Sequence, residues 1–176
     1  MKTLSFLLFL LFSYSCAHSR AEELYNNKLY KESLKEYEAI LKRNPEDVEA
    51  KIGRQKSKSG IISEMVIEIR LQRLAGNQKT AADKLVDLIE FESKWNDKLN
   101  YSAGQSQQKE LDYARKYLVS RANNALDQNN ALEAQAILVE YDPIFKASKA
   151  KDDQILLKNS ISQVARQVCF KMKKEI

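Results

Sequence analysis

The stretch AEELYNNKLYKESLKEYEAILKR, residues 21–43, decides the fold. Aromatic and aliphatic side chains recur in it at intervals of three and four residues, at Tyr30, Leu34, Tyr37 and Leu41. This spacing places them on one face of an α-helix. Leu24 belongs to a shorter helical segment before them. Asn44 and Pro45 end the second helix, because the residue before a proline is driven out of the helical region. We therefore predict two consecutive helices that share one buried side.

This stretch resembles a tetratricopeptide repeat, a helix-turn-helix unit of about 34 residues that is closed by a proline. With Pro45 as the closing proline, four residues fall in the register of the repeat. Ala21 takes the small position of the first helix and Tyr30 the aromatic position after the turn. Ser33 takes the small position between helices, and Tyr37 takes the aromatic packing position. The resemblance implies a first unit near residues 18–45, in which small residues let the helix axes approach closely.

Further along the chain, the same register predicts a second unit near residues 46–77. Ile52-Gly53 resembles the Leu-Gly pair of a first helix, and Gly60 resembles the turn glycine. An amphipathic helix should follow over 61–74, with its stripe formed by Ile62, Met65, Val66, Ile69 and Leu74. Gly76-Asn77 should end it.

The remaining sequence predicts a helix over 79–95, a long polar loop over 96–108 and a weaker repeat near 115–143, closed by Pro143. A capping helix is expected over 150–172, with Leu157, Ile161, Val164, Val168 and Met172 on one side. The chain has only 4 Gly and 2 Pro, which disfavours turn-rich β folds. We predict an all-α domain over 16–176, with tetratricopeptide-like antiparallel helix pairs stacked into a short right-handed solenoid. An unrelated antiparallel helical bundle is the alternative.

The first 15 residues have the layout of a secretory signal peptide. Lys2 gives a positive start, and an apolar run over residues 4–12 precedes small and polar residues. This run is far shorter than the roughly 20 residues that cross a bilayer as a helix. We predict cleavage before Cys16 or, alternatively, after Ala17, so the protein is expected to be exported.

The end of the leader, Ser13-Tyr14-Ser15-Cys16, resembles the box that precedes the acylated cysteine of bacterial lipoproteins. Ser15 fits the small position before the cysteine, whereas Ser13 and Tyr14 differ from the usual residues. The resemblance implies acyl chains such as palmitate on Cys16, and these would anchor the protein in a membrane. Ala17 in the next position resembles an outer-membrane address, which implies the periplasmic face of that membrane. Cleavage after Ala17 would instead give a soluble periplasmic or secreted form.

The sequence contains few residues that are suited to catalysis. His18, the only histidine in the sequence, is expected in a mobile terminus, so a histidine-based triad is not predicted. Cys169 is expected to be a small buried residue of the last helix rather than a nucleophile. Clustered histidines and cysteines for a metal and a glycine-rich phosphate loop are not found in the sequence. We therefore predict no enzyme activity, catalytic residue, metal or cofactor.

Binding remains as the mode of action. The net charge is +5, but an exported protein does not routinely meet nucleic acid, and no small-molecule substrate is evident. Lys51, Arg54 and Lys58 recur at intervals of three and four and should form a basic ridge for a protein or peptide partner, with an acidic peptide or tail as the candidate ligand. The hypothesis is a lipid-anchored adaptor or scaffold of the bacterial cell envelope. The alternative is a structural subunit of an envelope, secretion or outer-membrane assembly complex.

Overall fold

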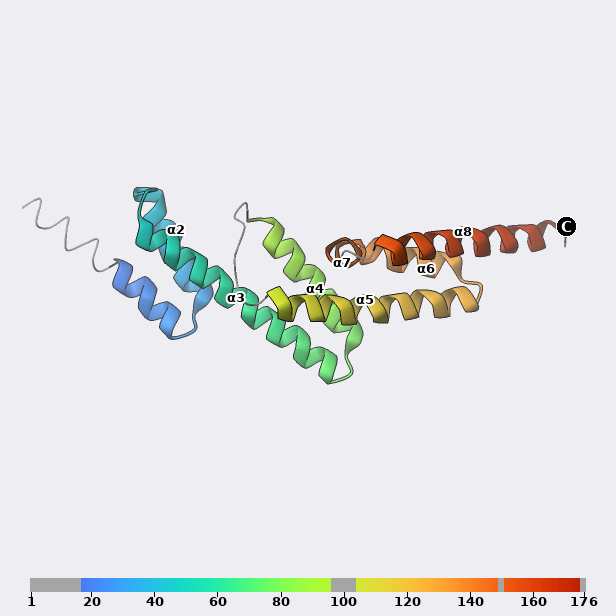
Figure 1. The fold of residues 1–176 in the computed structure, drawn as a ribbon, viewed down its shortest axis with the longest axis horizontal. Helices are drawn as coiled ribbons and strands as arrows, with labels where there is room; N and C mark the ends of the chain where they lie inside the picture. Colours follow the sequence, from blue (N-terminus) through green and yellow to red (C-terminus); the bar gives the residue numbers. More distant parts are fainter. Residues whose placement is uncertain (1–16, 96–103, 149–150, 175–176) are drawn as a thin grey trace, which may run out of the picture. The chain divides into compact units, whose positions relative to one another are not determined.

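The computed structural model describes residues 17–95, 104–148 and 151–174, and the described residues form helices without any strand (Figure 1). The prediction of an all-α fold is confirmed. A first helix covers residues 17–26. It is followed by α2 (Tyr30–Arg43), α3 (Val48–Leu74), α4 (Gln78–Ser93), α5 (Gly104–Asp127), α6 (Ala131–Glu140), α7 (Asp142–Ala147) and α8 (Lys151–Lys174). The predicted signal peptide and Cys16 lie outside the described residues.

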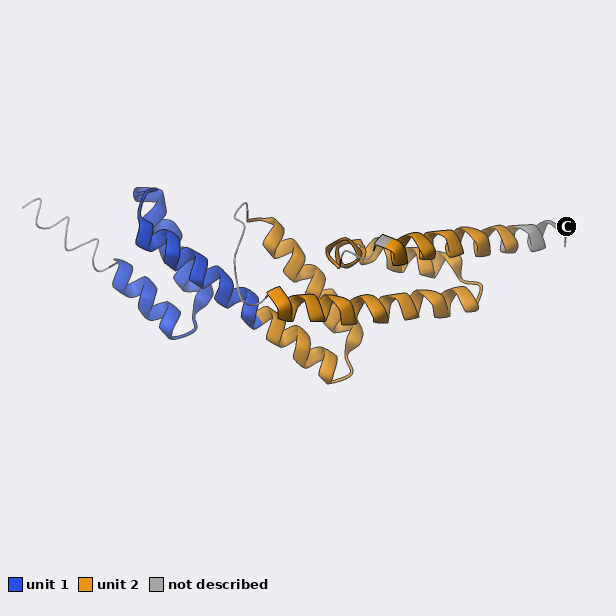
Figure 2. Ribbon diagram, viewed as in Figure 1, with its two compact units in different colours: residues 1–64, 99–101 blue, residues 65–98, 102–176 orange. Residues whose placement is uncertain are grey.

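The helices group into two compact units, where one domain over 16–176 was expected (Figure 2). Unit 1 is described over residues 17–64, and unit 2 over 65–95, 104–148 and 151–174. The helix α3 runs from one unit into the other without a break. Within the part of the chain that the structure describes, no helix is both long enough and apolar enough to cross a membrane.

Unit 1 begins with the predicted helical hairpin. Lys28 adopts a left-handed conformation with φ of 62°, and it closes the turn between the first helix and α2. Leu29 N–H donates to Leu24 C=O at 2.9 Å across this turn, which satisfies a carbonyl at the end of the first helix. The helix α2 then ends at Arg43, where Asn44-Pro45 predicted its end. Residues 18–45 therefore contain the two consecutive helices that the spacing predicted, joined by a turn.

Small residues bring the helices of unit 1 close together. Ala21 and Ser33, the two small positions of the predicted register, are both fully buried. Ser33 Oγ donates to Ala21 C=O at 2.8 Å and lies 2.9 Å from Ser57 Oγ on α3. Buried hydroxyl groups need hydrogen-bond partners, and these bonds satisfy both serines. Unit 1 is therefore joined at this contact by hydrogen bonds between short side chains. The apolar side chains around them include Tyr37, Ile40 and Ala50.

The second predicted unit is not a helix pair. The helix α3 continues through Gly60 for 27 residues, so the turn that was predicted at Gly60 is wrong. The glycine has a different physical role. A Cβ atom placed on Gly60 would lie 2.5 Å from Tyr30 Cδ1, and one on Gly53 would lie 2.1 Å from Tyr37 Cζ. Both glycines therefore let an aromatic ring of α2 rest against the α3 backbone.

The second half of α3 belongs to unit 2 and ends where Gly76-Asn77 predicted. Gly76 has φ of 84°, and Asn77 N–H donates to Gln72 C=O at 2.9 Å. The predicted stripe is partly confirmed: Ile62, Val66 and Ile69 are buried. Leu74, however, is 68% exposed, because it stands at the last turn of the helix.

Residues 104–108 of the loop predicted over 96–108 belong instead to α5, which begins at Gly104, and residues 96–103 lie outside the described residues. At its other end, α5 packs against α6 as a hairpin, in which Asn129 adopts φ of 57° at the predicted turn. Asn130 caps α6 by accepting the Glu133 N–H at 3.1 Å. Pro143 stands in the first turn of α7, directly after α6, and its missing N–H costs no hydrogen bond there.

The last helix, α8, covers the predicted capping helix and contacts both α5 and α6 (Figure 1). Leu157 and Ile161 of the predicted stripe are buried, and Val164 is half-buried. The side chains of Val168 and Met172 lie outside the described residues. An ion pair between Arg115 and Asp153 joins α8 to α5. Unit 2 is thus a helical cluster whose core includes Leu85, Leu118, Tyr141, Phe145 and Leu157.

Candidate functional site

A groove of about 480 Å³ lies in unit 1 between the first helix and the start of α3. We call it the unit 1 groove. Its walls are Glu22, Tyr25 and Asn26 from the first helix and Val48, Glu49, Ile52 and Lys56 from α3, and Tyr37 and Gly53 form its floor. A volume of this size accommodates several side chains of a ligand.

The close approach of α2 and α3 creates the floor of this groove. Tyr37 is only 6% exposed, because its ring lies against the bare backbone of Gly53. The α3 wall carries two aliphatic side chains that are open to solvent: Val48 is 68% exposed and Ile52 is 49% exposed. Val48 and Ile52 are four residues apart on α3, so their side chains stand on the same face of the helix. Together they form a short aliphatic strip beside the aromatic floor of the groove.

Negative charge gathers at one end of the groove. Burial raises the pKa of the Tyr37 hydroxyl, and the carboxylates of Glu22 and Glu49 raise it further. The carboxylates of Glu22 and Glu49 are therefore both close enough to Tyr37 to influence its hydroxyl. Lys56 also lines the groove, but it follows Glu49 by seven residues, or about 10 Å along the helix. Arg20, the arginine nearest to Glu22 along the chain, pairs with Glu36 of α2 at 3.4 Å.

His18 has a structural position that the sequence did not predict. Its side chain is 15% exposed, and its Nε2 lies 3.1 Å from Asp47 Oδ2. Its Nδ1 lies 3.8 Å from Glu49 Oε2. The expectation of a mobile terminus was wrong at this residue, because the first helix already begins at residue 17 and holds the ring against the start of α3.

Asp47 caps the start of α3 and is hydrogen-bonded to the ring of His18. The Ala50 N–H donates to Asp47 Oδ1 at 2.9 Å. This backbone hydrogen bond lowers the pKa of the Asp47 carboxyl; burial opposes the shift, and the hydrogen bond to His18 lowers the pKa further. The network fixes the direction in which α3 leaves the turn, and so it fixes the wall that carries Glu49 and Ile52.

The predicted basic ridge does not form a continuous exposed surface. Lys58 is buried, with 4% of its surface exposed, and Arg54 is half-buried. Lys51 is 43% exposed and pairs with Glu46 at 3.0 Å. The intervals of three and four place all three on one side of α3, but in its middle turns that side faces the unit interior. Partner binding by these three residues stays a prediction. The sequence did not predict that Glu22, Glu49 and Ile52 would line a groove.

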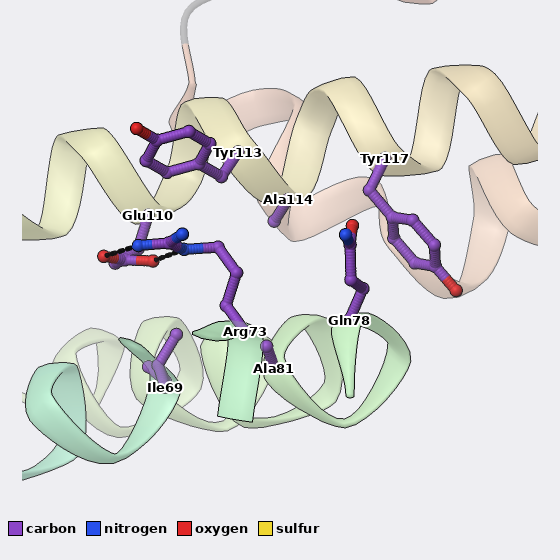
Figure 3. A pocket seen from close by; sticks show the side chains of 8 residues that line it. All are labelled: Ile69, Arg73, Gln78, Ala81, Glu110, Tyr113, Ala114 and Tyr117. Atoms are coloured by element: carbon purple, nitrogen blue, oxygen red, sulfur yellow. Dashed lines mark hydrogen bonds and ion pairs between the residues drawn. The ribbon is translucent and has the colours of Figure 1, made fainter. Parts of the chain in front are cut away.

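A second hollow lies in unit 2, between the end of α3, the start of α4 and α5 (Figure 3). Its volume is about 10 Å³, which leaves room for one water molecule and no ligand. Arg73 donates from Nε to Glu110 Oε2 at 2.7 Å and from Nη2 to Glu110 Oε1 at 3.2 Å, and its guanidinium lies 4.1 Å from the ring centre of Tyr113. Arg70 donates to the same carboxylate at 3.1 Å.

This cluster has a structural role. Burial of Glu110 is the largest influence on its pKa and raises it, but the hydrogen bonds and charges of Arg73 and Arg70 outweigh burial and lower the pKa overall. A carboxylate that is 2% exposed and paired with two arginines ties α5 to the end of α3. Such a pair stabilises the fold only while both partners remain.

Reactive side chains are spread thinly over the described residues. Cys169 is exposed rather than buried as we expected, since it stands on the outer side of α8. Over residues 17–95, 104–148 and 151–174, no group of three or more metal-ligating side chains comes together. Tyr141 donates to Asp83 Oδ1 at 2.6 Å, and its burial raises its pKa to about 12, so the phenol acts as a hydrogen-bond donor that joins the turn between α6 and α7 to α4.

Comparisons with known protein families, with curated proteins and with solved structures found no match to this chain.

Proposed function

We propose that the protein is a non-enzymatic adaptor that holds a segment of another protein in the unit 1 groove. The observation that carries this proposal is the exposure of Val48 and Ile52 above the buried ring of Tyr37. Burial of these two aliphatic side chains by a partner would contribute about 25 cal/mol for each Å² removed from water. The helices that form the walls are stabilised without a ligand, which keeps the cost of ordering the site low on binding.

The resemblance to a tetratricopeptide repeat supports the same function. In a stack of helix pairs, the first helix of each unit lines the concave surface. The first helix and α3 occupy those places in the predicted register, and the groove lies between them. We propose that unit 1 is a tetratricopeptide-like module of one helix pair and the helix that follows it.

We further propose that the mature protein is exported and is anchored by acyl chains on Cys16 at the periplasmic face of the outer membrane. The support for this is the leader sequence and the lipoprotein-like box. The adaptor would then work within the cell envelope, where its partner would be an envelope or secreted protein.

Site-specific photocrosslinking tests the proposed function. A photoreactive amino acid at Ile52 should give one covalent adduct in intact cells, and mass spectrometry would identify the partner. The same amino acid at Glu38, an exposed position on α2 outside the groove, is the matched control. Equal adducts at both positions, or no adduct at Ile52, would contradict the proposal.

The alternative is a structural subunit, and one feature of unit 2 favours it. Leu132 and Val139 are 85% and 66% exposed, and they stand seven residues apart on the same face of α6. This face could pack against a larger complex. Replacing both residues by lysine should release the protein from its complex under this alternative and leave the Ile52 adduct unchanged under the adaptor proposal.

A further inference from the structure

We infer that the unit 1 groove selects a basic segment, in which an arginine or lysine is followed by an aliphatic residue. This inference rests on the proposed function and names the chemistry of the partner. It differs from the acidic partner that the basic ridge predicted, because the groove carries two carboxylates, Glu22 and Glu49, near Tyr37.

Two carboxylates supply the selectivity. Glu22 and Glu49 stand on opposite walls, and both act on the Tyr37 hydroxyl between them. Glu22 makes no ion pair with any of the residues that the structure describes, and Glu49 has only the His18 ring at 3.8 Å. Glu49 is 73% exposed, so a cation that enters the groove can reach it. A guanidinium or ammonium group between two carboxylates would be attracted to both.

The tyrosine rings suit the same ligand. Tyr25 lines the groove next to Glu22 and lies 5.3 Å from the ring of Tyr30, which holds it in place. A cation over an aromatic face gains further attraction, and arginine stacks on such faces better than lysine. Glutamate in the ligand would instead meet two like charges at this end.

The apolar wall selects the neighbouring residue. Val48 and Glu49 are adjacent on α3, and Ile52 lies three residues beyond Glu49, so the aliphatic surface begins beside the carboxylate. A ligand in an extended conformation that places its cation between Glu22 and Glu49 would bring the next side chains toward Val48 and Ile52. Lys56, further along the wall, would disfavour a second cation there.

Binding of synthetic peptides to the full mature chain in detergent tests the inference. We would use fluorescein-labelled peptides that contain Arg-Leu, Gln-Leu or Glu-Leu at the centre of an otherwise identical neutral sequence, and measure fluorescence anisotropy. At low salt, the Arg-Leu peptide should bind about tenfold more tightly than the Glu-Leu peptide. The difference should shrink as salt is added, because the carboxylates are near the surface.

Charge reversal locates the effect. The double variant Glu22→Lys, Glu49→Lys should lose about tenfold or more in affinity for the Arg-Leu peptide, and Glu22→Gln about two- to fivefold. Glu38→Lys makes the same kind of charge change on an exposed surface of α2 and should stay within twofold. The single variant Glu22→Lys makes that charge change inside the groove, and a loss equal to that of Glu38→Lys would reduce the effect to overall charge and overturn the inference. Circular dichroism would show that the variants are folded.

One further variant separates this inference from the proposed function. If Ile52→Asp abolishes binding of the Glu-Leu peptide and that peptide binds more tightly than the Arg-Leu peptide, the groove binds segments but the inference is wrong. If Ile52→Asp changes the binding of no peptide, both the inference and the proposed function are wrong.

Discussion

Gly53 sits in the middle of α3, where an alanine would ordinarily stabilise a helix by roughly 0.5–1 kcal/mol. The position of Tyr37 reverses this expectation. Its ring lies where the Cβ atom of an alanine would be placed, and because the ring is largely buried, either the ring or the α3 backbone would have to shift. The contact that makes the floor of the groove is therefore set by the absence of one carbon atom.

We expect Gly53→Ala to lower the free energy of unfolding by about 1–3 kcal/mol, because an added methyl group at this close contact forces the Tyr37 ring and the α3 backbone apart. Urea denaturation followed by circular dichroism would measure it. Gly104→Ala is the matched control, since a Cβ atom there would meet nothing within 4 Å. A stabilised Gly53→Ala variant would mean that α2 and α3 do not pack as described.

Asp47 links stability to pH. The hydrogen bond from Ala50 N–H, and to a lesser degree the one to His18, lowers the pKa of this carboxyl in the folded protein. Its unfolded value is about 3.9. Its ionised form therefore stabilises the fold at every pH above that value, and this stabilisation is lost as the pH falls through the lower folded value.

The expected result is that Asp47→Asn destabilises the protein more at pH 6 than at pH 3. The urea midpoints of both proteins at the two pH values would show it, because the contributions of other carboxylates cancel in the difference. Asp87→Asn, at an exposed position on α4, provides the comparison. A gap between wild type and Asp47→Asn that stays constant from pH 6 to pH 3 would show that the lowered pKa of Asp47 does not contribute to stability.

At the scale of elements, α5 is tied to the end of α3 by one buried carboxylate (Figure 3). Because Glu110 accepts from two arginines, its loss leaves cationic groups that are only partly exposed without their partner. Hydrogen bonds to charged groups contribute about 1.5–3 kcal/mol. We therefore expect Glu110→Gln to lower the free energy of unfolding of unit 2 by about that amount.

Thermal and urea unfolding would measure this loss, with Glu90→Gln on the exposed side of α4 as the control. The variant keeps the size of the side chain, so a cavity cannot explain the result. If Glu110→Gln unfolds like wild type, the two arginines are satisfied by solvent, and the ion pairs do not stabilise the contact between α3 and α5.

At the scale of the whole molecule, local signals predicted the helices well. The stop at Asn44-Pro45, the turn at Asn129-Asn130 and the end of α3 at Gly76 follow from backbone preferences of single residues, which act in any fold. The structural role of Gly60 cannot be predicted in this way. A glycine permits a turn, but it also permits close packing, and only the position of Tyr30 in space decides between the two.

The candidate site was harder to predict for the same reason. Lys51, Arg54 and Lys58 share a side of α3, but the sequence does not say which side faces solvent. Buried Ala50, Gly53 and Ser57 follow the same intervals of three and four and are all small. Read together, they mark the packed side and leave Val48, Glu49 and Ile52 on the open side. The spacing of these small residues is visible in the sequence, but the resemblance of Ile52-Gly53 to a Leu-Gly pair favours a different interpretation of Gly53.

The leader and unit 1 together give a prediction about the intact protein. The first helix begins at residue 17, Ala17 packs against the core around Ala21 and Tyr37, and His18 is held by Asp47. A lipid on Cys16 would therefore be joined to a packed helix without a linker. Cleavage after Ala17 would instead remove one contact of that core.

We expect Cys16→Ser to abolish the incorporation of labelled palmitate and to move the protein from the membrane fraction to the soluble fraction, because acyl chains supply the attachment. Cys169→Ser, which removes an exposed thiol on α8, is the matched control and should keep both the label and the membrane fraction. The mass of the mature N-terminus measures the cleavage site directly. An unmodified N-terminus at His18, with palmitate absent from the wild-type protein, would mean that the mature protein is soluble and that unit 1 folds without Ala17.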